Sequence, residues 1–142
     1  MIALLDISVL IARADPGHQF HARAGAWLRR QKQLEIASCP LTENGFLRIY
    51  GHPSYPGGPG SPEGAAKDLA ILRNRSDHRF LPDSVSLLDR SISLSGSGVS
   101  QLTDLYLLAL AVHHSAQFVT LDHRIPAQLV QGGKSSLIVI PR

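Results

Sequence analysis

The chain of 142 residues has a single cysteine, Cys39, which excludes an internal disulfide and favours a reducing compartment. It also lacks an apolar run long enough to span a membrane. Met1 leads straight into an apolar segment with no positively charged stretch, so we expect no signal peptide and a cytoplasmic protein. Charged residues make up only 18% of the chain and the net charge is +3, which is too mild to indicate a polyanionic partner by itself.

Apolar residues make up 44% of the chain, in segments that alternate between strand and helix patterns. At this length the simplest expectation is one domain, residues 1–142, with a real core. Predicted strands cover residues 1–5, 34–38, 78–82, 118–121 and 136–140. One short predicted helix begins near residue 9, and the other predicted helices cover residues 18–33, 41–50, 62–74, 83–93, 102–115 and 125–130. The alternation predicts an α/β fold, a three-layer α/β/α sandwich around a central parallel sheet of about five strands.

Acidic residues are predicted to gather at one edge of this sheet. Asp6 follows the first strand and Asp122 follows the fourth. Glu43 and Asp104 lie in the first turns of the helices that come after the second and third strands. In a parallel sheet the carboxyl ends of the strands and the amino ends of the following helices share one edge, where ligands bind. Each acid alone has a simpler explanation, as a helix cap or as the partner of a helix dipole, worth about 0.3–1 kcal/mol.

Taken together, these acids indicate a cation site. Two carboxylates about 4 Å apart repel by about 4 kcal/mol at an effective dielectric of about 20. A chain that gathers several of them therefore either protonates some or binds a cation. Oxygen ligands without cysteine suit Mg²⁺ or Mn²⁺. The chemistry that fits is hydrolysis of a phosphodiester, with the metal lowering the pKa of the attacking water.

The segments around these acids resemble the motifs of a PIN domain. The four similar segments are Leu4-Leu-Asp6-Ile-Ser8-Val-Leu-Ile11, Pro40-Leu-Thr-Glu43-Asn-Gly-Phe-Leu-Arg-Ile49, Thr103-Asp104-Leu-Tyr-Leu-Leu-Ala-Leu-Ala111 and Thr120-Leu-Asp122-His. They arrive in the family's order and cover nearly the whole chain. The likeness is closest to the VapC-type toxins of bacterial toxin–antitoxin pairs.

The resemblance implies a metal-dependent endoribonuclease that forms a homodimer and is inhibited by a cognate VapB-type antitoxin. It implies Mg²⁺ (or Mn²⁺) as the cofactor, with Asp6, Glu43, Asp104 and Asp122 carried over as catalytic metal ligands. It also implies supporting polar roles for Ser8 and Thr103, which stand beside the first and third acids. Two residues past the fourth acid, where the family sometimes has an acid or Asn, this chain has Arg124, a departure that concerns a second metal site.

Other functions stay open on the residues alone. The leading alternative is a non-catalytic RNA-binding module on the same fold, although carboxylates repel RNA phosphates unless a metal intervenes. A receiver-type signalling domain would need a phosphorylatable Asp at the end of the third strand and a Lys at the end of the fifth. Here those strands lead into Leu81-Pro82 and Pro141-Arg142.

Two further motifs carry less weight. The segment Gly132-Gly133-Lys134-Ser135 resembles the end of a phosphate-binding loop, but residue 128 is Gln and the segment leads into a strand rather than a helix. His123 adjoins Asp122, where it is either solvated or in reach of a substrate phosphate.

Overall fold

Five parallel strands form the centre of the molecule. The computed structural model describes all 142 residues. Its strands are β1 (Ile2–Leu5), β2 (Glu35–Ser38), β3 (His78–Phe80), β4 (Gln117–Thr120) and β5 (Leu137–Val139). They pair in the order β3-β2-β1-β4-β5, so the first strand of the chain is central, and every pairing is parallel. The predicted parallel sheet of five strands is confirmed.

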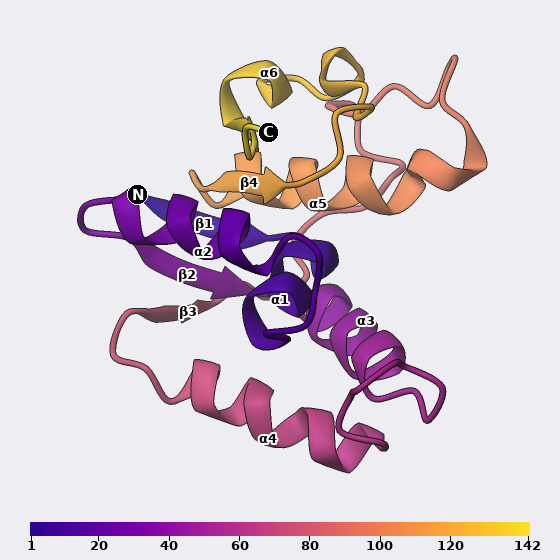
Figure 1. The fold of residues 1–142 in the computed structure, drawn as a ribbon. Coiled ribbons are helices and arrows are strands. Elements are labelled where there is room, and N and C mark those ends of the chain that lie inside the picture. The colour runs from indigo at the N-terminus through magenta and orange to yellow at the C-terminus, as the bar shows by residue number, and fades with distance from the viewer.

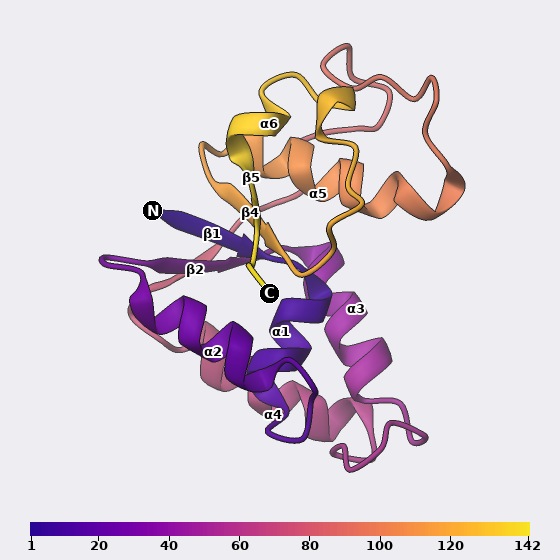
Figure 2. The same ribbon diagram turned by 45° about the horizontal axis from the view of Figure 1, so that its top comes forward.

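Helices cover both faces of the sheet. They are α1 (Ile7–Ala14), α2 (His21–Arg30), α3 (Pro40–Tyr50), α4 (Pro62–Arg73), α5 (Leu102–His113) and α6 (Gly133–Ser136). Figures 1 and 2 show α1 to α4 on one side of the sheet and α5 and α6 on the other. The molecule is therefore a three-layer α/β/α sandwich, as predicted. None of the helices combines the length and apolarity that crossing a membrane requires.

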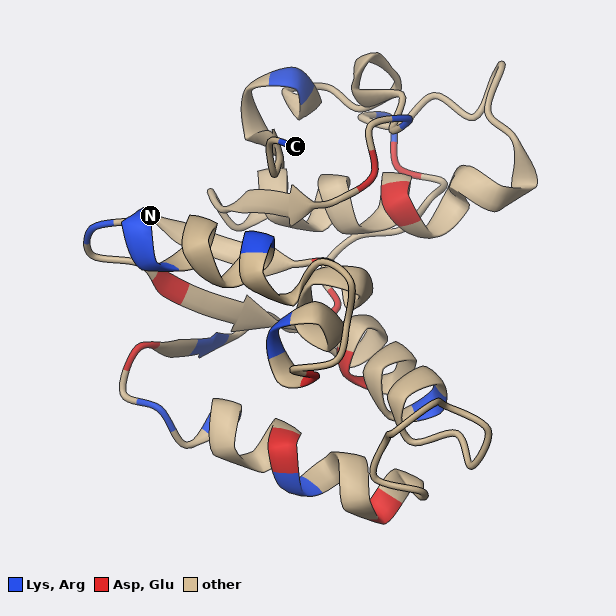
Figure 3. Ribbon diagram, viewed as in Figure 1, with Lys and Arg blue, Asp and Glu red and all other residues tan.

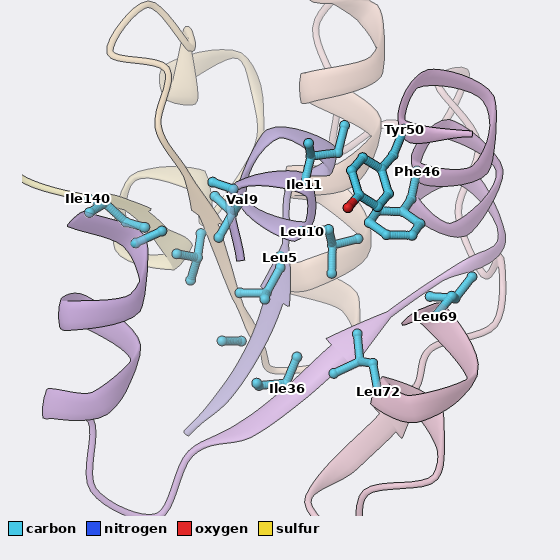
Figure 4. Packing of buried hydrophobic residues seen from close by; sticks show 14 of the residues in the cluster. Leu5, Val9, Leu10, Ile11, Ile36, Phe46, Tyr50, Leu69, Leu72 and Ile140 are labelled. Carbon is cyan, nitrogen blue, oxygen red and sulfur yellow. The ribbon is translucent and has the colours of Figure 1, made fainter. Parts of the chain in front are cut away.

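The pleat of the strands divides the buried side chains between two cores. Successive side chains point to opposite faces, so Leu5 belongs to the core under α1 to α4, and its neighbour Leu4 belongs to the core under α5. In β4, Val119 belongs to the first of these cores and Phe118 to the second. Figure 4 shows the first core, in which Ile36 and other strand residues meet side chains from α1, α3 and α4. Burial on both faces explains why β1 is apolar throughout.

One predicted helix is wrong. Residues 83–93 form turns instead of a helix. The Ser86 amide donates a local hydrogen bond of 3.0 Å to Asp89 Oδ2. Local bonds between side chains and the backbone compete with helix formation. The segment ends in an isolated antiparallel bridge between Ile92 and Val130. This bridge places Ile92, the one buried side chain of the segment, in the core under α5, and no helix is needed.

Two other predicted helices are shorter than expected. Residues 125–130 contain only the 3₁₀ turn η2 (Ala127–Leu129), because Val130 is extended and pairs with Ile92 in the antiparallel bridge. The helix predicted from residue 18 begins at His21, because the Phe20 amide donates to the His18 ring at 3.0 Å in a turn. The boundaries of α3, α4 and α5 agree with the prediction to within two residues.

Candidate metal centre

Asp6 lies between the end of β1 and the start of α1. Its Oδ1 accepts a hydrogen bond of 2.7 Å from the Ile7 amide, so it is the N-cap of α1. Its Oδ2 accepts one of 2.7 Å from the hydroxyl of Thr120, the last residue of β4. Burial nevertheless raises the pKa of Asp6, and the charge of Asp122 raises it further. Asp6 is thus both a helix cap and a buried acid that sits beside another carboxylate.

Thr120 connects two of the predicted acids. Besides donating to Asp6, its hydroxyl oxygen accepts a hydrogen bond of 3.1 Å from the Asp122 amide. Asp122 then forms an ion pair with Arg124, with Oδ1 3.0 Å from the guanidinium Nε. These contacts with Arg124 hold the pKa of Asp122 below its usual value. The fourth acid is therefore held in place at both its backbone and its side chain.

Asp104 lies in the first turn of α5, on the layer opposite to α1. Burial, followed by the charges of Asp6 and Asp122, raises its pKa to about 6. No hydrogen bond contributes to this pKa, so the carboxylate is held without a donor from the protein. Figure 3 shows acidic positions close together at the first turn of α5 and in the loop after β4. Three of the four predicted acids therefore act on one another electrostatically.

Glu43 lies in the first turn of α3 and is held by a separate set of contacts. Its Oε2 accepts a 2.7 Å hydrogen bond from Ser38, and its Oε1 is 3.3 Å from a guanidinium nitrogen of Arg73. Ser38 is also 2.8 Å from His78 Nε2. Because the single hydroxyl proton of Ser38 goes to Glu43, His78 donates the second bond. Glu43 does not contribute to the raised pKa of Asp6 or Asp104.

The residues present fit a hard cation in kind but do not form a finished coordination sphere. Carboxylate oxygens are the ligands that Mg²⁺ and Mn²⁺ take in proteins. Burial raises the pKa of Asp104 most, and the charges of Asp6 and Asp122 raise it further, a repulsion that a cation would relieve. No three His, Cys, Asp or Glu side chains converge closely enough to coordinate an ion as they stand. The arginine partners of Asp122 and Glu43 would have to move for both to turn towards one ion.

The two predicted supporting residues differ in position. The hydroxyl of Ser8 lies 3.5 Å from Asp6 Oδ2, which is too long for a strong hydrogen bond. Thr103 is exposed on α5 beside Asp104. The firmer polar support comes from Thr120 and Ser38, which are fully buried. They are the last residues of β4 and β2, the two strands that flank β1.

Sequence reasoning gave no supporting role to Ser38, His78 or Thr120. A detectable signal existed for two of them, because a hydroxyl at the end of an otherwise apolar strand is costly to bury without a partner. His78 had no such signal, since its contact with Ser38 spans 40 residues of sequence.

Two of the hollows on the surface of the molecule are large enough to consider as binding sites. The larger, about 750 Å³, is lined by α1, α2, α4 and β2, and none of the four acids borders it. The smaller, about 330 Å³, is lined by Asp122 together with Ser8, Leu121, His123, Arg124 and Arg142. Of these two hollows, only the smaller one is therefore next to the candidate metal centre, through Asp122.

Comparison with known proteins identifies the family of the chain. The PIN domain family profile matches residues 3–128 of the chain. Ribonuclease VapC44 of Mycobacterium tuberculosis is 42% identical over 138 residues, covering 93% of this chain and 94% of that protein. Ribonuclease VapC38 of the same organism is 41% identical over 122 residues and 85% of each chain, and Ribonuclease VapC39 is 33% identical over 142 residues and 99% of each. The chain therefore belongs to the PIN-domain family, among its VapC-type members.

Proposed function

We propose that this protein is a Mg²⁺- or Mn²⁺-dependent endoribonuclease toxin whose site is formed by Asp6, Glu43, Asp104 and Asp122. The reaction class is supported by membership of the PIN family and by the ribonuclease names of the relatives. The observation that carries the site is the raised pKa of Asp104, to which Asp6 and Asp122 both contribute. Acids that merely capped separate helices would not act on one another in this way.

The chain's own residues prepare the site by orientation. Thr120 fixes Asp6 and Ser38 fixes Glu43, so two carboxylates at the starts of different helices are oriented before a ligand arrives. Asp104 is mostly ionised above its pKa of about 6 and has no donor from the protein. A bound divalent cation would lower the pKa of an attacking water and offset charge on the RNA phosphate.

Arginines neutralise part of the site in the protein described here. Arg124 pairs with Asp122 and Arg73 pairs with Glu43. Arg124 is 87% exposed, so exchanging its ion pair for other contacts costs little. Arg73 is 46% exposed and also packs over the ring of Phe80, so it is held more firmly. We propose that Asp6 and Asp104 form the permanent part of the metal site, and that Glu43 and Asp122 complete it when their arginines move.

The partners follow from the same proposal. We propose a cytoplasmic homodimer, a single nuclease domain over residues 1–142, and inhibition by a VapB-type antitoxin that covers the acidic edge. Large exposed apolar side chains support contact surfaces for such partners, since Leu88 is 87% exposed, Val99 88% and Ile71 67%. Light scattering at tens of micromolar should show a dimer, and a monomer at that concentration would contradict this part of the proposal.

The function is tested with the purified chain and total RNA. Cleavage should require Mg²⁺ or Mn²⁺, stop in EDTA and return when the metal is restored. Single-stranded or looped RNA should be preferred, and binding should weaken as salt rises. If the protein bound RNA well but left it intact with either metal, the non-catalytic RNA-binding module would be the correct reading.

A further inference from the structure

The smaller hollow, which we call the arginine notch, lies beside the acids and is lined by Ser8, Leu121, Asp122, His123, Arg124 and Arg142. Three separate elements form its walls: the first turn of α1, the loop after β4 and the segment after β5. Most of its lining is polar or charged, and Leu121 is the only apolar residue in it. An apolar ligand is therefore not its natural occupant.

The sheet itself places the arginines at this notch. β4 and β5 pair in parallel through Thr120 and Val139, and the Ile140 amide donates to the Thr120 carbonyl at 2.8 Å. The loop with Arg124 and the segment with Arg142 therefore leave the sheet at the same edge. A side chain from α2 fixes the second segment, because Arg23 donates to the Ile140 carbonyl at 2.8 Å. Arg142 thus stands only two residues beyond a buried, doubly anchored residue.

The two arginines of the notch differ in their partners. Asp122 is the only acidic side chain that lines the notch, and it is paired with Arg124. The Arg142 side chain has no ion pair within the chain, so its guanidinium is available to bind an anion. Guanidinium groups offer a planar fork of donors that fits phosphate oxygens.

We propose that the arginine notch binds a backbone phosphate of RNA next to the bond that is cut, with Arg142 and Arg124 as its ligands. This inference rests on the proposed ribonuclease function, because it takes RNA as the occupant. A polyanion that approaches a group of carboxylates is repelled by them. A cationic subsite that adjoins Asp122 offsets this repulsion and fixes the register of the strand across the acids. Arg124 lies where it can pass from Asp122 to the phosphate when Asp122 takes up another partner.

The test measures binding separately from cleavage. A fluorescent single-stranded RNA oligonucleotide is titrated with the protein in EDTA at several salt concentrations, for the parent, Arg142→Ala, Arg142→Lys and Arg124→Ala. Losing the phosphate contact of Arg142 should weaken binding about tenfold near 0.1 M salt and lower the slope of log affinity against log salt by about 0.7. Arg124→Ala should have a smaller effect in EDTA, because Arg124 is then still paired with Asp122. Arg142→Lys keeps the charge and should recover most of the affinity, although it lacks the planar fork.

Lys32→Ala is the matched control. Lys32 is exposed in the turn that leads into β2, at the amino end of the sheet and so at the opposite edge from the notch. It removes the same unit of charge, so it measures the effect of net charge alone, and the salt slope should stay that of the parent. An equal loss in Lys32→Ala, or a parent-like slope in Arg142→Ala, would overturn the proposal.

The two proposals fail in different ways. If the parent cuts RNA but both arginine variants bind it with parental affinity and slope, the notch proposal is wrong and the nuclease stands. If the parent never cuts RNA but the arginine variants lose affinity and slope, the notch is a phosphate subsite of a binding module, and the nuclease proposal is wrong.

Discussion

Replacing Asp104 by Asn separates a metal site from a coincidence of helix caps. The change keeps the shape of the side chain and removes its charge. Asp104 has a pKa of about 6 because it is partly buried and faces the charges of Asp6 and Asp122. If the acids form one site, the metal-free variant should be at least as stable as the parent, because the change relieves like-charge repulsion.

The magnitude follows from the pKa. A rise from 3.8 to about 6 corresponds to about 3 kcal/mol of destabilisation at about 1.4 kcal/mol per pKa unit. Because Asp104 is only half buried, solvent screening reduces this figure to about 1 kcal/mol. In the window between 3.8 and about 6 the folded protein keeps a proton that the unfolded chain loses, so the parent loses stability as pH rises through it. The advantage of the variant should therefore grow from pH 4 to 6 and stay constant above.

The assay is a set of thermal melts in EDTA and in Mg²⁺, together with RNA cleavage. Mg²⁺ at about a hundred times its dissociation constant should stabilise the parent by about 2.7 kcal/mol and the variant far less. Cleavage should fall by orders of magnitude in the variant. Glu63→Gln is the matched control, since Glu63 is the acid in the first turn of α4. It should lose about 0.3–1 kcal/mol of dipole stabilisation and keep the Mg²⁺ response and the activity. An Asp104→Asn protein that melts lower in EDTA, responds to Mg²⁺ like the parent and still cuts RNA would refute the metal site.

Two further changes test the supports of the fold and the site. Ser38→Ala removes the buried hydroxyl between Glu43 and His78 and should cost about 1–3 kcal/mol in urea unfolding, because it leaves polar groups unpaired. It should also slow cleavage by freeing Glu43, and cleavage at the parental rate would mean that Arg73 and the helix hold Glu43 unaided. Tyr55→Phe removes the 2.7 Å bond from the Tyr55 hydroxyl to buried Asp15 and should cost a similar amount while cleavage stays parental. Unchanged urea unfolding would show that water replaces the lost donor.

The sheet and the position of each acid were predictable because both depend on local patterns. An apolar run that ends at Asp6 indicates a buried strand followed by a turn, and parallel strands bring their carboxyl ends to one edge. The alternation of elements then determines the layers. The segment 83–93 was not predictable in the same way, because its turns and its bridge to Val130 depend on a partner far along the chain.

The contacts around Glu43 show why the candidate site was only partly predictable. Its place in the first turn of α3 follows from Pro40 at the start of that helix. The direction of its carboxylate depends on Ser38, which is close in sequence, and on Arg73, which is 30 residues away in α4. Contacts of this second kind arise only when α4 and β3 have packed beside β2. A sequence motif can thus identify the acid without identifying its partner.

The neighbours of these acids explain how a protein keeps several carboxylates at one edge and stays folded. Asp6 accepts two short hydrogen bonds, and Asp122 and Glu43 each have an arginine, so three of the four negative charges have direct partners. Asp104 lacks one, and burial together with the charges of Asp6 and Asp122 raises its pKa to about 6. Burial and the charge of Asp122 also raise the pKa of Asp6, so these two carboxylates carry the unfavourable charge at this edge. A cation in the proposed metal site would relieve the charge of both side chains, so metal binding and folding stability should be coupled at Asp6 and Asp104.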